Sequence, residues 1–451
     1  MNRMSDHMPA AETAMAASAR SGLERRRLRI GIIPLTDCAV IVAAKEKGFF
    51  ARHGVEVEIT REATWAGIRD KLAAGVLDAA HMLAGIPIAT ALGIEALDCP
   101  MVTAMSLGLN GNAVTVSPAL FGQMHSAAPE AATNRQASSQ ALRHVLERRK
   151  QEKLPPPTIA VVHPFSSHNY LLRYWLAAAG IDPSRDVRMT VVPPPRMVDD
   201  LRHGKVDGFC VGEPWSALAV SQGVGCAVAT GYDIWQNAPE KVLGVTKHWA
   251  QTNPRTHVAL IKALIEAAQW AEAKEHREEL ASMLCNGGYV GVPREVVALS
   301  LRGEYRASNG APVEPLADFH VLFRHAATFP WRSHAAWFVT QMIRWGDVER
   351  VVDIDAVVRE VYLPDVYRAA ANELGILCPT TDGKDEGTHD APWPLGDGQQ
   401  SITMGADRFC DGASFDPAWP LTYLSRFQIH TLSAAWRHHF EGVASTSHLG
   451  R

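Results

Sequence analysis

His163 and His168 lie on either side of a short polar loop, so their chemistry is considered first. Either imidazole can exchange protons near neutral pH, donate a hydrogen bond or bind a metal ion. Their five-residue spacing differs from the helical spacing that presents two histidines to one metal ion. The pair therefore predicts no metal site, and a structural role for each ring stays open beside a functional one.

The sequence lacks the short motifs of several common chemistries. We find no glycine-rich dinucleotide loop, Walker A loop, zinc-protease motif or nucleophile elbow. The nearest glycine pair, Gly223 and Gly225, has no third glycine to complete a phosphate-binding turn. Dinucleotide, nucleoside triphosphate and zinc-protease chemistry are therefore disfavoured, and no cofactor is expected.

The cysteine pattern favours buried, reduced thiols. The seven cysteines are odd in number and include no C-x-x-C pair, which argues against a zinc site or a thioredoxin-like motif. Most have apolar neighbours, as buried thiols do. Their number and spacing are consistent with a reducing compartment. They are Cys38, Cys99, Cys210, Cys226, Cys285, Cys378 and Cys410.

Charge and the N-terminal segment bear on partners and location. The net charge of −4 over 451 residues gives no basic field for nucleic acid or an anionic membrane. No uninterrupted apolar run reaches the ~18 residues of a spanning helix. Residues 1–22 contain no apolar signal core, and the arginines at 25–27 precede a stretch interrupted by Pro34 and Asp37. We expect a cytoplasmic protein, with export as the alternative.

The elements that must position these residues alternate between strands and short helices. Apolar or alternating segments predict strands at 28–33, 55–59, 78–82 and 100–106, with helices between them. A second series begins with a strand at 158–162, and His168 opens the helix that follows. Such alternation is typical of α/β sheets with helices on both faces, whose ligands bind beyond the strand ends.

The series predict two lobes and several additions. Residues 28–117, with part of the C-terminal region, are expected to form lobe 1, and 158–250 lobe 2. Residues 118–157 are interpreted as the crossing between them, and 251–375 as a helical region packing on lobe 1. The ends are assigned as a disordered tail at 1–27 and an irregular extension at 376–451.

Segments spread over both lobes resemble the nitrate-binding family that includes NrtA, the bicarbonate-binding CmpA and the cytoplasmic nitrate sensor NasS. No segment is diagnostic alone, but their shared order is specific. The resemblance implies a two-lobed periplasmic-binding-protein type II fold. The segments are LRIGIIPLTDCAVIVAAKEKGFF, TWAGIRDKLAAGVLDAAHML, LNGNAVTVS, SSHNYLLRYWLAAAGIDP, VDGFCVGEPW, PEKVLGVTKHWA and DGASFDPAWPLTYLSRF.

By this resemblance, four residues are expected to contact the ligand. Trp65 stands at the family's cleft tryptophan, and His168 matches its cleft histidine. Asn110 lies where transporters often carry glutamine, a departure that bears on pocket size. Lys241 matches the charge-bearing lysine, where bicarbonate-binding relatives have an acidic, metal-assisted arrangement; lysine therefore favours nitrate or nitrite.

The chemistry of these side chains suits such an anion. Lys241 can supply one positive charge, His168 and Trp65 ring N–H groups, and Asn110 an amide N–H, in a cationic, water-poor crevice. The helix that His168 opens adds backbone N–H groups. Gly111 either lets the backbone approach the ion or makes a turn. Glu213 is expected to pair with Lys241 or to orient His168, with local backbone bonding as the alternative.

The resemblance also implies a role. A cytoplasmic receptor of this family would report nitrate to a NasT-type antiterminator, an RNA-binding protein of the ANTAR class. Two alternatives remain: an exported receptor of an ABC importer, and an enzyme of the thiamine-pyrimidine type on the same fold. Neither a cysteine-rich motif nor a pyridoxal-phosphate lysine setting supports the enzyme.

Overall fold

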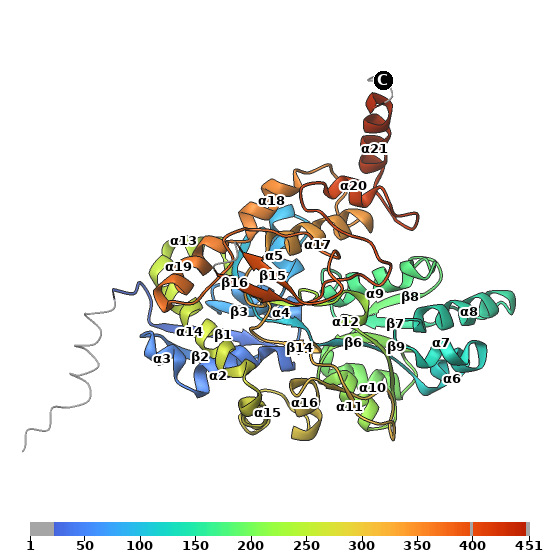
Figure 1. The fold of residues 1–451 in the computed structure, drawn as a ribbon, viewed down its shortest axis with the longest axis horizontal. Coiled ribbons are helices and arrows are strands. Elements are labelled where there is room, and N and C mark those ends of the chain that lie inside the picture. Colours follow the sequence, from blue (N-terminus) through green and yellow to red (C-terminus); the bar gives the residue numbers. More distant parts are fainter. Residues whose placement is uncertain (1–21, 397–399, 448–451) are drawn as a thin grey trace, which may run out of the picture.

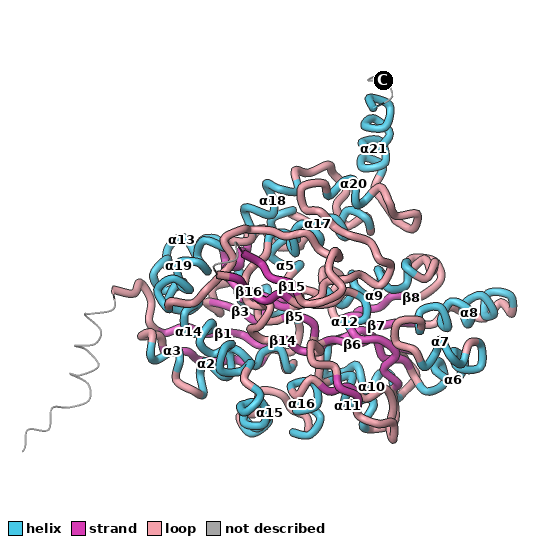
Figure 2. The backbone as a smooth tube through the Cα atoms, in the orientation of Figure 1, coloured by secondary structure: helices cyan, strands magenta, loops and turns pink. Residues whose placement is uncertain are grey.

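Two mixed β-sheets, each flanked by helices, form the body of the protein. The computed structural model describes residues 22–396 and 400–447. The sheets lie in two lobes that meet at the middle of the molecule (Figure 1). Helices cover them, and the strands of both sheets run through the interior (Figure 2). No helix among the described residues is long and apolar enough to cross a membrane.

The first lobe is built on a five-stranded sheet in the order β2-β1-β3-β11-β4. Strands β1, β2 and β3 pair in parallel, and β11 runs antiparallel to β3 and β4. Every residue of β3 and β4 is buried, as expected for strands with both faces covered. The strands are β1 Arg27–Ile32, β2 Glu56–Arg61, β3 Ala79–Leu83, β4 Met101–Ser106 and β11 Lys241–Thr246.

The second lobe has a sheet in the order β10-β6-β9-β7-β8. Here β7 pairs in parallel with β8 and β9, while β6 is antiparallel to β9 and β10. The strands are β6 Asn112–Val116, β7 Thr158–Val161, β8 Arg188–Val191, β9 Gly208–Gly212 and β10 Cys226–Thr230.

Two strands lie in the other lobe from the one that the sequence assigned. We expected residues 28–117 in lobe 1, but β6 belongs to the second sheet, and β11, expected in lobe 2, belongs to the first. The chain thus crosses between lobes just before β6 and again before β11. Periodicity identifies a strand but carries no information about its distant partner, which is why the boundaries were misplaced.

The segment 118–157 is an insertion within the second lobe rather than a crossing. The strands before and after it, β6 and β7, belong to one sheet. Its helices pack on one another at the outer end of that lobe (Figure 1). They are α6 Pro118–Ala127, α7 Pro129–Thr133 and α8 Ser138–Gln151.

The remaining helices cover the two sheets. In the first lobe α2 and α3 pack against α14, which also contacts α19, and α4 and α5 lie on β3 and β4. The first lobe carries η1 Thr36–Cys38, α2 Ala39–Glu46, α3 Phe49–Arg52, α4 Trp65–Ala73 and α5 Gly85–Leu92. The second carries α9 Ser167–Ala178, η2 Pro194–Arg196, α10 Met197–Arg202, α11 Trp215–Ser221 and α12 Gly231–Ile234.

The region after β11 is mostly helical, and much of it packs on the first lobe through α14 and α19. Trp331, Trp337 and Trp345 are buried in this region and belong to the hydrophobic core. The elements are α13 Lys247–Thr252, α14 Pro254–Glu272, η3 Lys274–His276, α15 Arg277–Asn286, α16 Arg294–Leu301, α17 Arg332–Arg344, α18 Ile354–Val361 and α19 Pro364–Leu374. Short strands β12 Glu304–Tyr305, β13 Glu314–Pro315, β14 His320–Val321 and β5 Leu109–Asn110 form two small ladders.

The extension after residue 375 lies across the body and carries regular elements of its own. Phe409 stacks on Trp235 with ring centroids 4.6 Å apart, and the Arg344 guanidinium lies 3.7 Å from the ring centroid of Phe427. These contacts fasten the extension to α17 and to the second lobe. Its elements are β15 Trp393–Gly396, β16 Ser401–Met404, α20 Pro420–Leu424 and α21 Ala434–Ser447, the last projecting from the body (Figure 1).

Candidate functional site

A buried cluster of charged side chains lies where the lobes meet. Lys241 Nζ is 2.8 Å from Asp37 Oδ2 and also contacts Glu240 Oε1. His168 Nε2, from the second lobe, is 2.8 Å from the same Glu240 oxygen. All four residues are at most 3% exposed. The cluster therefore joins the two lobes through Glu240.

Strand ends and a helix start place these residues. Asp37 follows β1 by one turn, and His168 follows β7 at the first turn of α9, so each comes from the carboxyl end of a parallel strand. Ser166 caps α9 by accepting a hydrogen bond from the Asn169 N–H at 3.0 Å, which fixes the direction of the helix start. Open α/β sheets bind their ligands at the carboxyl ends of their parallel strands, where these residues lie.

Glu240 is held from the second lobe by two further donors. The Asn112 amide donates to Glu240 Oε2 at 2.9 Å, and the Ser167 hydroxyl donates to the same oxygen. One carboxylate therefore receives Asn112 and Ser167 on one oxygen and Lys241 and His168 on the other. Hydrogen-bond donors and a positive charge around both oxygens keep a buried carboxylate ionised.

Trp65 and His81 complete the side of the cluster in the first lobe. His81 Nε2 lies 2.9 Å from Asp37 Oδ1, and the Ile33 N–H donates to His81 Nδ1 at 3.4 Å. The hydrogen-bond network thus assigns the proton of His81 to Nε2, facing Asp37. The Trp65 ring centroid is 5.4 Å from that of His81 and 5.5 Å from Lys241 Nζ, within reach of a cation–π contact.

The environment sets the ionisation of the cluster. Burial opposes charge on every member, but the carboxylates of Asp37 and Glu240 together raise the pKa of Lys241. In return, His168 and Lys241 outweigh burial and lower the pKa of Glu240 to about 2, while Lys241 and His81 lower that of Asp37 further. Burial lowers the pKa of His168 even though Glu240 opposes the shift.

The formal charge of the cluster differs from our expectation of a cationic crevice. At neutral pH Asp37 and Glu240 carry two negative charges and Lys241 one positive charge, so the sum is −1 with His168 neutral. The expectation was wrong because the residue types named from sequence left out two carboxylates. They lie in segments already recognised: Asp37 in the turn after the first strand, and Glu240 next to Lys241.

Polar atoms without an aligned hydrogen-bond partner gather at this cluster. Although the short contacts of Asp37, His81 and His168 suit ion pairs, their geometry does not satisfy the angles of hydrogen bonds. Buried polar atoms are normally satisfied, so such a concentration points to a bound ligand or water. The atoms are Thr36 Oγ1, Asp37 Oδ1 and Oδ2, Trp65 Nε1, His81 Nε2, Asn112 Oδ1, and His168 Nδ1 and Nε2.

Of the residues named from sequence, Trp65, His168 and Lys241 are brought together. The Asn110 amide is engaged elsewhere: it donates to the Asp318 carbonyl at 2.7 Å, and its oxygen accepts from the Ala238 N–H at 3.0 Å. Asn110 has φ 59° and Gly111 φ 80°, as in a left-handed turn. A side chain at Gly111 would meet the His320 ring at 3.1 Å. In this structure both residues shape a turn.

Glu213 takes the local role rather than the expected pairing with Lys241 or His168. Its Oε2 accepts a hydrogen bond from the Ala217 N–H at 3.0 Å in the first turn of α11. Burial raises the pKa of Glu213 to about 7, although the hydrogen bond from the Ala217 N–H opposes the shift. Glu240 and Asp37 perform the pairing that we expected of Glu213.

Direct contacts hold the lobes together around the cluster. The Thr36 N–H donates to the Glu213 carbonyl at 2.7 Å, and the Trp215 indole N–H donates to the Pro34 carbonyl at 3.1 Å. Gly85 abuts the Phe165 carbonyl so closely that a β-carbon there would lie 2.2 Å from its oxygen. The cluster is therefore buried between lobes that touch one another.

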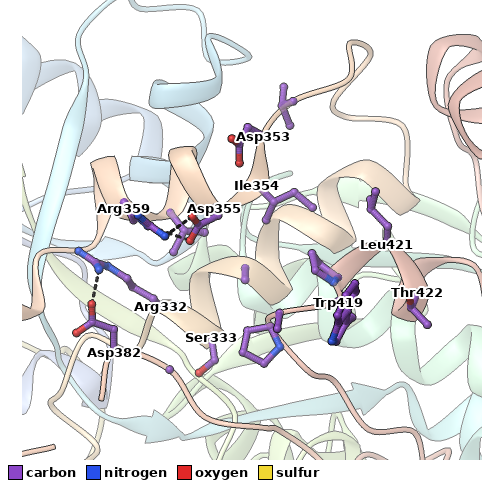
Figure 3. A pocket seen from close by; sticks show the side chains of 17 residues that line it. Arg332, Ser333, Asp353, Ile354, Asp355, Arg359, Asp382, Trp419, Leu421 and Thr422 are labelled. Atoms are coloured by element: carbon purple, nitrogen blue, oxygen red, sulfur yellow. Dashed lines mark hydrogen bonds and ion pairs between the residues drawn. The ribbon is translucent and has the colours of Figure 1, made fainter. Parts of the chain in front are cut away.

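A separate cavity of about 900 Å³ lies between α17, α18 and the segment 417–422. Figure 3 shows two ion pairs in its lining, Arg332 with Asp382 and Arg359 with Asp355, and Asp353 apart from them. None of the six residues named from sequence lines it. Its size therefore does not make it the candidate site.

Two α/β lobes that close on a buried polar cluster define a two-lobed solute-binding protein of the periplasmic-binding-protein type II fold. The structure superposes on the periplasmic nitrate-binding protein NrtA of Synechocystis PCC 6803 with a TM-score of 0.79 and 30% sequence identity, over 90% of this chain and 100% of that one. It also matches the alkanesulfonate-binding protein SsuA of Xanthomonas axonopodis, with a TM-score of 0.50 and 17% identity over 75% of this chain and 99% of that chain, which supports the fold alone.

Sequence relatives place the chain in a family. Residues 21–285 match the NMT1-like family. The nitrate/nitrite binding protein NrtA of Nostoc is 31% identical over 94% of this chain and 91% of its own length. The nitrate import ATP-binding protein NrtC of Synechocystis is 38% identical over 92% of this chain, which spans only 57% of that longer relative. The chain therefore belongs to the NMT1-like family and to the group of NrtA and CmpA proteins.

Proposed function

We propose that this protein is a receptor for nitrate or nitrite, and that it acts as a cytoplasmic sensor. One observation carries the binding role: the indole N–H of Trp65 and the ring nitrogens of His168 lack aligned partners beside the charged ammonium of Lys241. Nitrate is small and planar, and its three oxygens only accept hydrogen bonds. Donors grouped around one positive charge suit it.

The names of the relatives agree with this ligand class. Members of the group are named for nitrate, nitrite and bicarbonate. Bicarbonate differs from nitrate in carrying an O–H, so it can donate to a carboxylate. Asp37 and Glu240 could accept such a hydrogen bond, so bicarbonate is included in the titration below. Because the donor groups of Trp65 and His168 without aligned partners suit an anion that only accepts hydrogen bonds, we assign nitrate or nitrite as the ligand.

The site is suited to binding rather than catalysis. Burial and the nearby carboxylate charges raise the pKa of the Cys38 and Cys210 thiols, which keeps both protonated and unreactive. Lys241 is held charged and so is a poor amine nucleophile. The enzyme alternative on this fold thus finds no activated nucleophile among the described residues of the cluster.

Two observations support a cytoplasmic location. All seven cysteines lie in the part of the chain that the structure describes, and all are free thiols, as is usual in a reducing compartment. A similar stretch also occurs in relatives of higher identity than NrtA that are named as ATP-binding import proteins.

The two lobes supply a switch for the sensor role. An anion that bridges Lys241 and His168 favours the closed lobes, since those residues belong to different lobes. A NasT-type RNA-binding antiterminator that prefers the open form would be released when the anion binds. The two ligands then oppose each other reciprocally, by a factor of roughly 5 to 150 for a coupling of about 1–3 kcal/mol.

Titration calorimetry tests the binding role. We expect nitrate or nitrite to bind the wild-type protein more tightly than bicarbonate, and Lys241→Ala to lose at least ~1.5–3 kcal/mol of binding free energy. Lys247→Ala is the matched control, because Lys247 is half-exposed and pairs with Glu360 away from the cluster. Equal binding by both variants would refute the assignment of the site.

The same titration with the antiterminator present tests the sensor role. We expect the antiterminator to lower the affinity of the protein for nitrate. Nitrate should lower the affinity for the antiterminator by the same factor. Identical nitrate affinities with and without partner would reject the coupling.

The alternative is the exported component of an importer. The match to NrtA proteins over nearly their whole length favours it. Fractionation of native cells, with N-terminal sequencing of the mature chain, separates the two functions. A processed chain outside the cytoplasm would establish export.

A further inference from the structure

The net negative charge of the buried cluster opposes the binding of any anion. Asp37 and Glu240 already outnumber Lys241, so a monovalent anion would raise the buried negative charge from one to two. Two of the three ammonium donors of Lys241 face these carboxylates. In a site closed to water, uncompensated like charges are strongly disfavoured.

His168 is the group best placed to offset this negative charge. It is completely buried, its Nε2 lies 2.8 Å from Glu240 Oε1, and its Nδ1 has no aligned partner. Both ring nitrogens donate when the imidazole is protonated, so a proton would add a donor as well as a charge.

Opposing groups surround the His168 ring. Glu240 and, further away, Asp37 favour the imidazolium, whereas Lys241, burial and the N-terminal end of α9 disfavour it. Gly212 of β9 also faces the ring: a β-carbon on it would lie 3.5 Å from His168 Nε2, and it adds no charge. An additional negative charge beside the ring shifts this balance toward the protonated form.

We propose that anion binding at this cluster is coupled to the uptake of one proton by His168, with Glu240 and Asp37 as the residues that impose the coupling. This inference rests on the proposed function and specifies how the site is regulated. The anion and proton enter together as a neutral pair. A divalent oxyanion such as sulfate would leave one further buried negative charge, so the same carboxylates select monovalent ligands.

The coupling has a definite sign with pH. In the free protein burial holds the pKa of His168 below its ordinary value, and the bound anion raises it. Binding is therefore strongest below the free-state pKa. Affinity falls by up to about tenfold per pH unit as the pH rises between the free-state and bound-state values.

Calorimetry in buffers of different ionisation enthalpy measures the protons taken up per nitrate bound. We expect uptake to approach about one proton within the range from about pH 6 to pH 9, and sulfate to bind at least tenfold more weakly than nitrate. Nitrate binding with no linked proton across this range would overturn the inference and leave the proposed function intact. A protein that binds neither nitrate nor nitrite at any pH would overturn both.

Two variants test which residues couple proton uptake to anion binding. Glu240→Gln removes one negative charge at nearly constant size; we expect less than half the proton uptake and tighter nitrate binding at about pH 8. His168→Asn should bind nitrate more weakly and without uptake. Full uptake by folded His168→Asn protein would show that another group takes the proton and would overturn the assignment.

Glu95→Gln is the matched control. Glu95 is another carboxylate near the lobe boundary, but it pairs with Arg69 and lies 3.7 Å from His163 rather than His168. Its variant should retain wild-type proton uptake. Circular dichroism confirms that each variant is folded, and loss of uptake in Glu95→Gln would overturn the role of Glu240 and Asp37.

Discussion

Lys241 Nζ and Asp37 Oδ2 lie 2.8 Å apart, both buried, at the junction of the lobes. Asp37 follows the first strand of the chain, whereas Lys241 opens the strand that returns to the first sheet from the second lobe. The charge that we propose attracts an anion thus also offsets part of the negative charge of the two carboxylates beside it. We therefore expect both anion binding and stability to depend on this one ammonium.

Removal of the ammonium should therefore destabilise the protein. Lys241→Met leaves Asp37 and Glu240 buried without their cation, and breaking a buried pair in this way costs about 3–5 kcal/mol. Urea denaturation monitored by circular dichroism measures the change. Lys247→Met, at a half-exposed ion pair, should change the free energy of unfolding by less than about 1 kcal/mol. Equal effects of the two changes would contradict the buried pairing.

Trp65→Phe should separate binding from stability. The substitution keeps the ring against His81 and Lys241 but removes an indole N–H that has no hydrogen-bond partner among the described residues. We expect nitrate affinity to fall by at least about tenfold, because one hydrogen bond to an anion is worth about 1.5 kcal/mol or more, with a small change in unfolding free energy. Calorimetry and thermal denaturation measure the two quantities.

Trp249→Phe serves as the control for Trp65. Its buried indole N–H also lacks a partner, but it lies on α13 away from the cluster. Its nitrate affinity should equal that of the wild type. An equal loss of affinity in both variants would show that Trp65 does not contact the anion.

Trp215→Phe should favour the open form. The indole of Trp215, in the second lobe, donates to the Pro34 carbonyl of the first, and the hydrogen bond is worth about 1 kcal/mol. We expect up to about a fivefold loss of nitrate affinity and a larger radius of gyration by small-angle X-ray scattering without nitrate. Trp337→Phe, which loses a hydrogen bond to Tyr423 outside the cluster, should affect stability alone.

Glu213 predicts a pH dependence of stability. Its pKa is raised by burial from 4.5 to about 7, so between these values the folded protein binds more protons than the unfolded chain. Stability therefore decreases as the pH rises through this window, and the cost is complete above about pH 7. Glu213→Gln should keep the hydrogen bond from Ala217, flatten this slope and stabilise the protein by about 2–3 kcal/mol at pH 8.

Urea denaturation at several pH values from about 5 to 8 tests this prediction. Glu304→Gln, at a partly exposed surface ion pair with Arg302, is the control and should leave the slope unchanged. A slope that persists in Glu213→Gln would place the titrating group elsewhere.

The sequence predicted the positions of strands and helices along the chain better than it predicted which lobe each strand belongs to. The apolar segment 28–33 overlaps β1, and His168 lies in the first turn of α9, as expected. The assignment of β6 and β11 to lobes was wrong, since a strand's hydrophobic pattern is the same in either sheet. Residues 1–21 of the expected N-terminal tail lie outside the described residues.

The sequence predicted only some of the residues of the candidate site. Trp65, His168 and Lys241 lie together, but Asp37, His81 and Glu240 were not named. Glu240 stands beside Lys241 in the chain, and that adjacency was the available signal. Glu213, chosen as the partner, bonds instead to the backbone of its own helix.

The sequence alone determined the α/β class, the two-lobed family fold and the presence of a cation, a histidine and a tryptophan fit to hold a small anion. These properties follow from local periodicity, residue chemistry and the order of segments along the chain. The tertiary structure alone decided the net charge of the site and which carboxylate meets which cation. Those depend on the distances between residues far apart in the chain, and over a few ångströms in a buried site such distances govern both pKa and affinity.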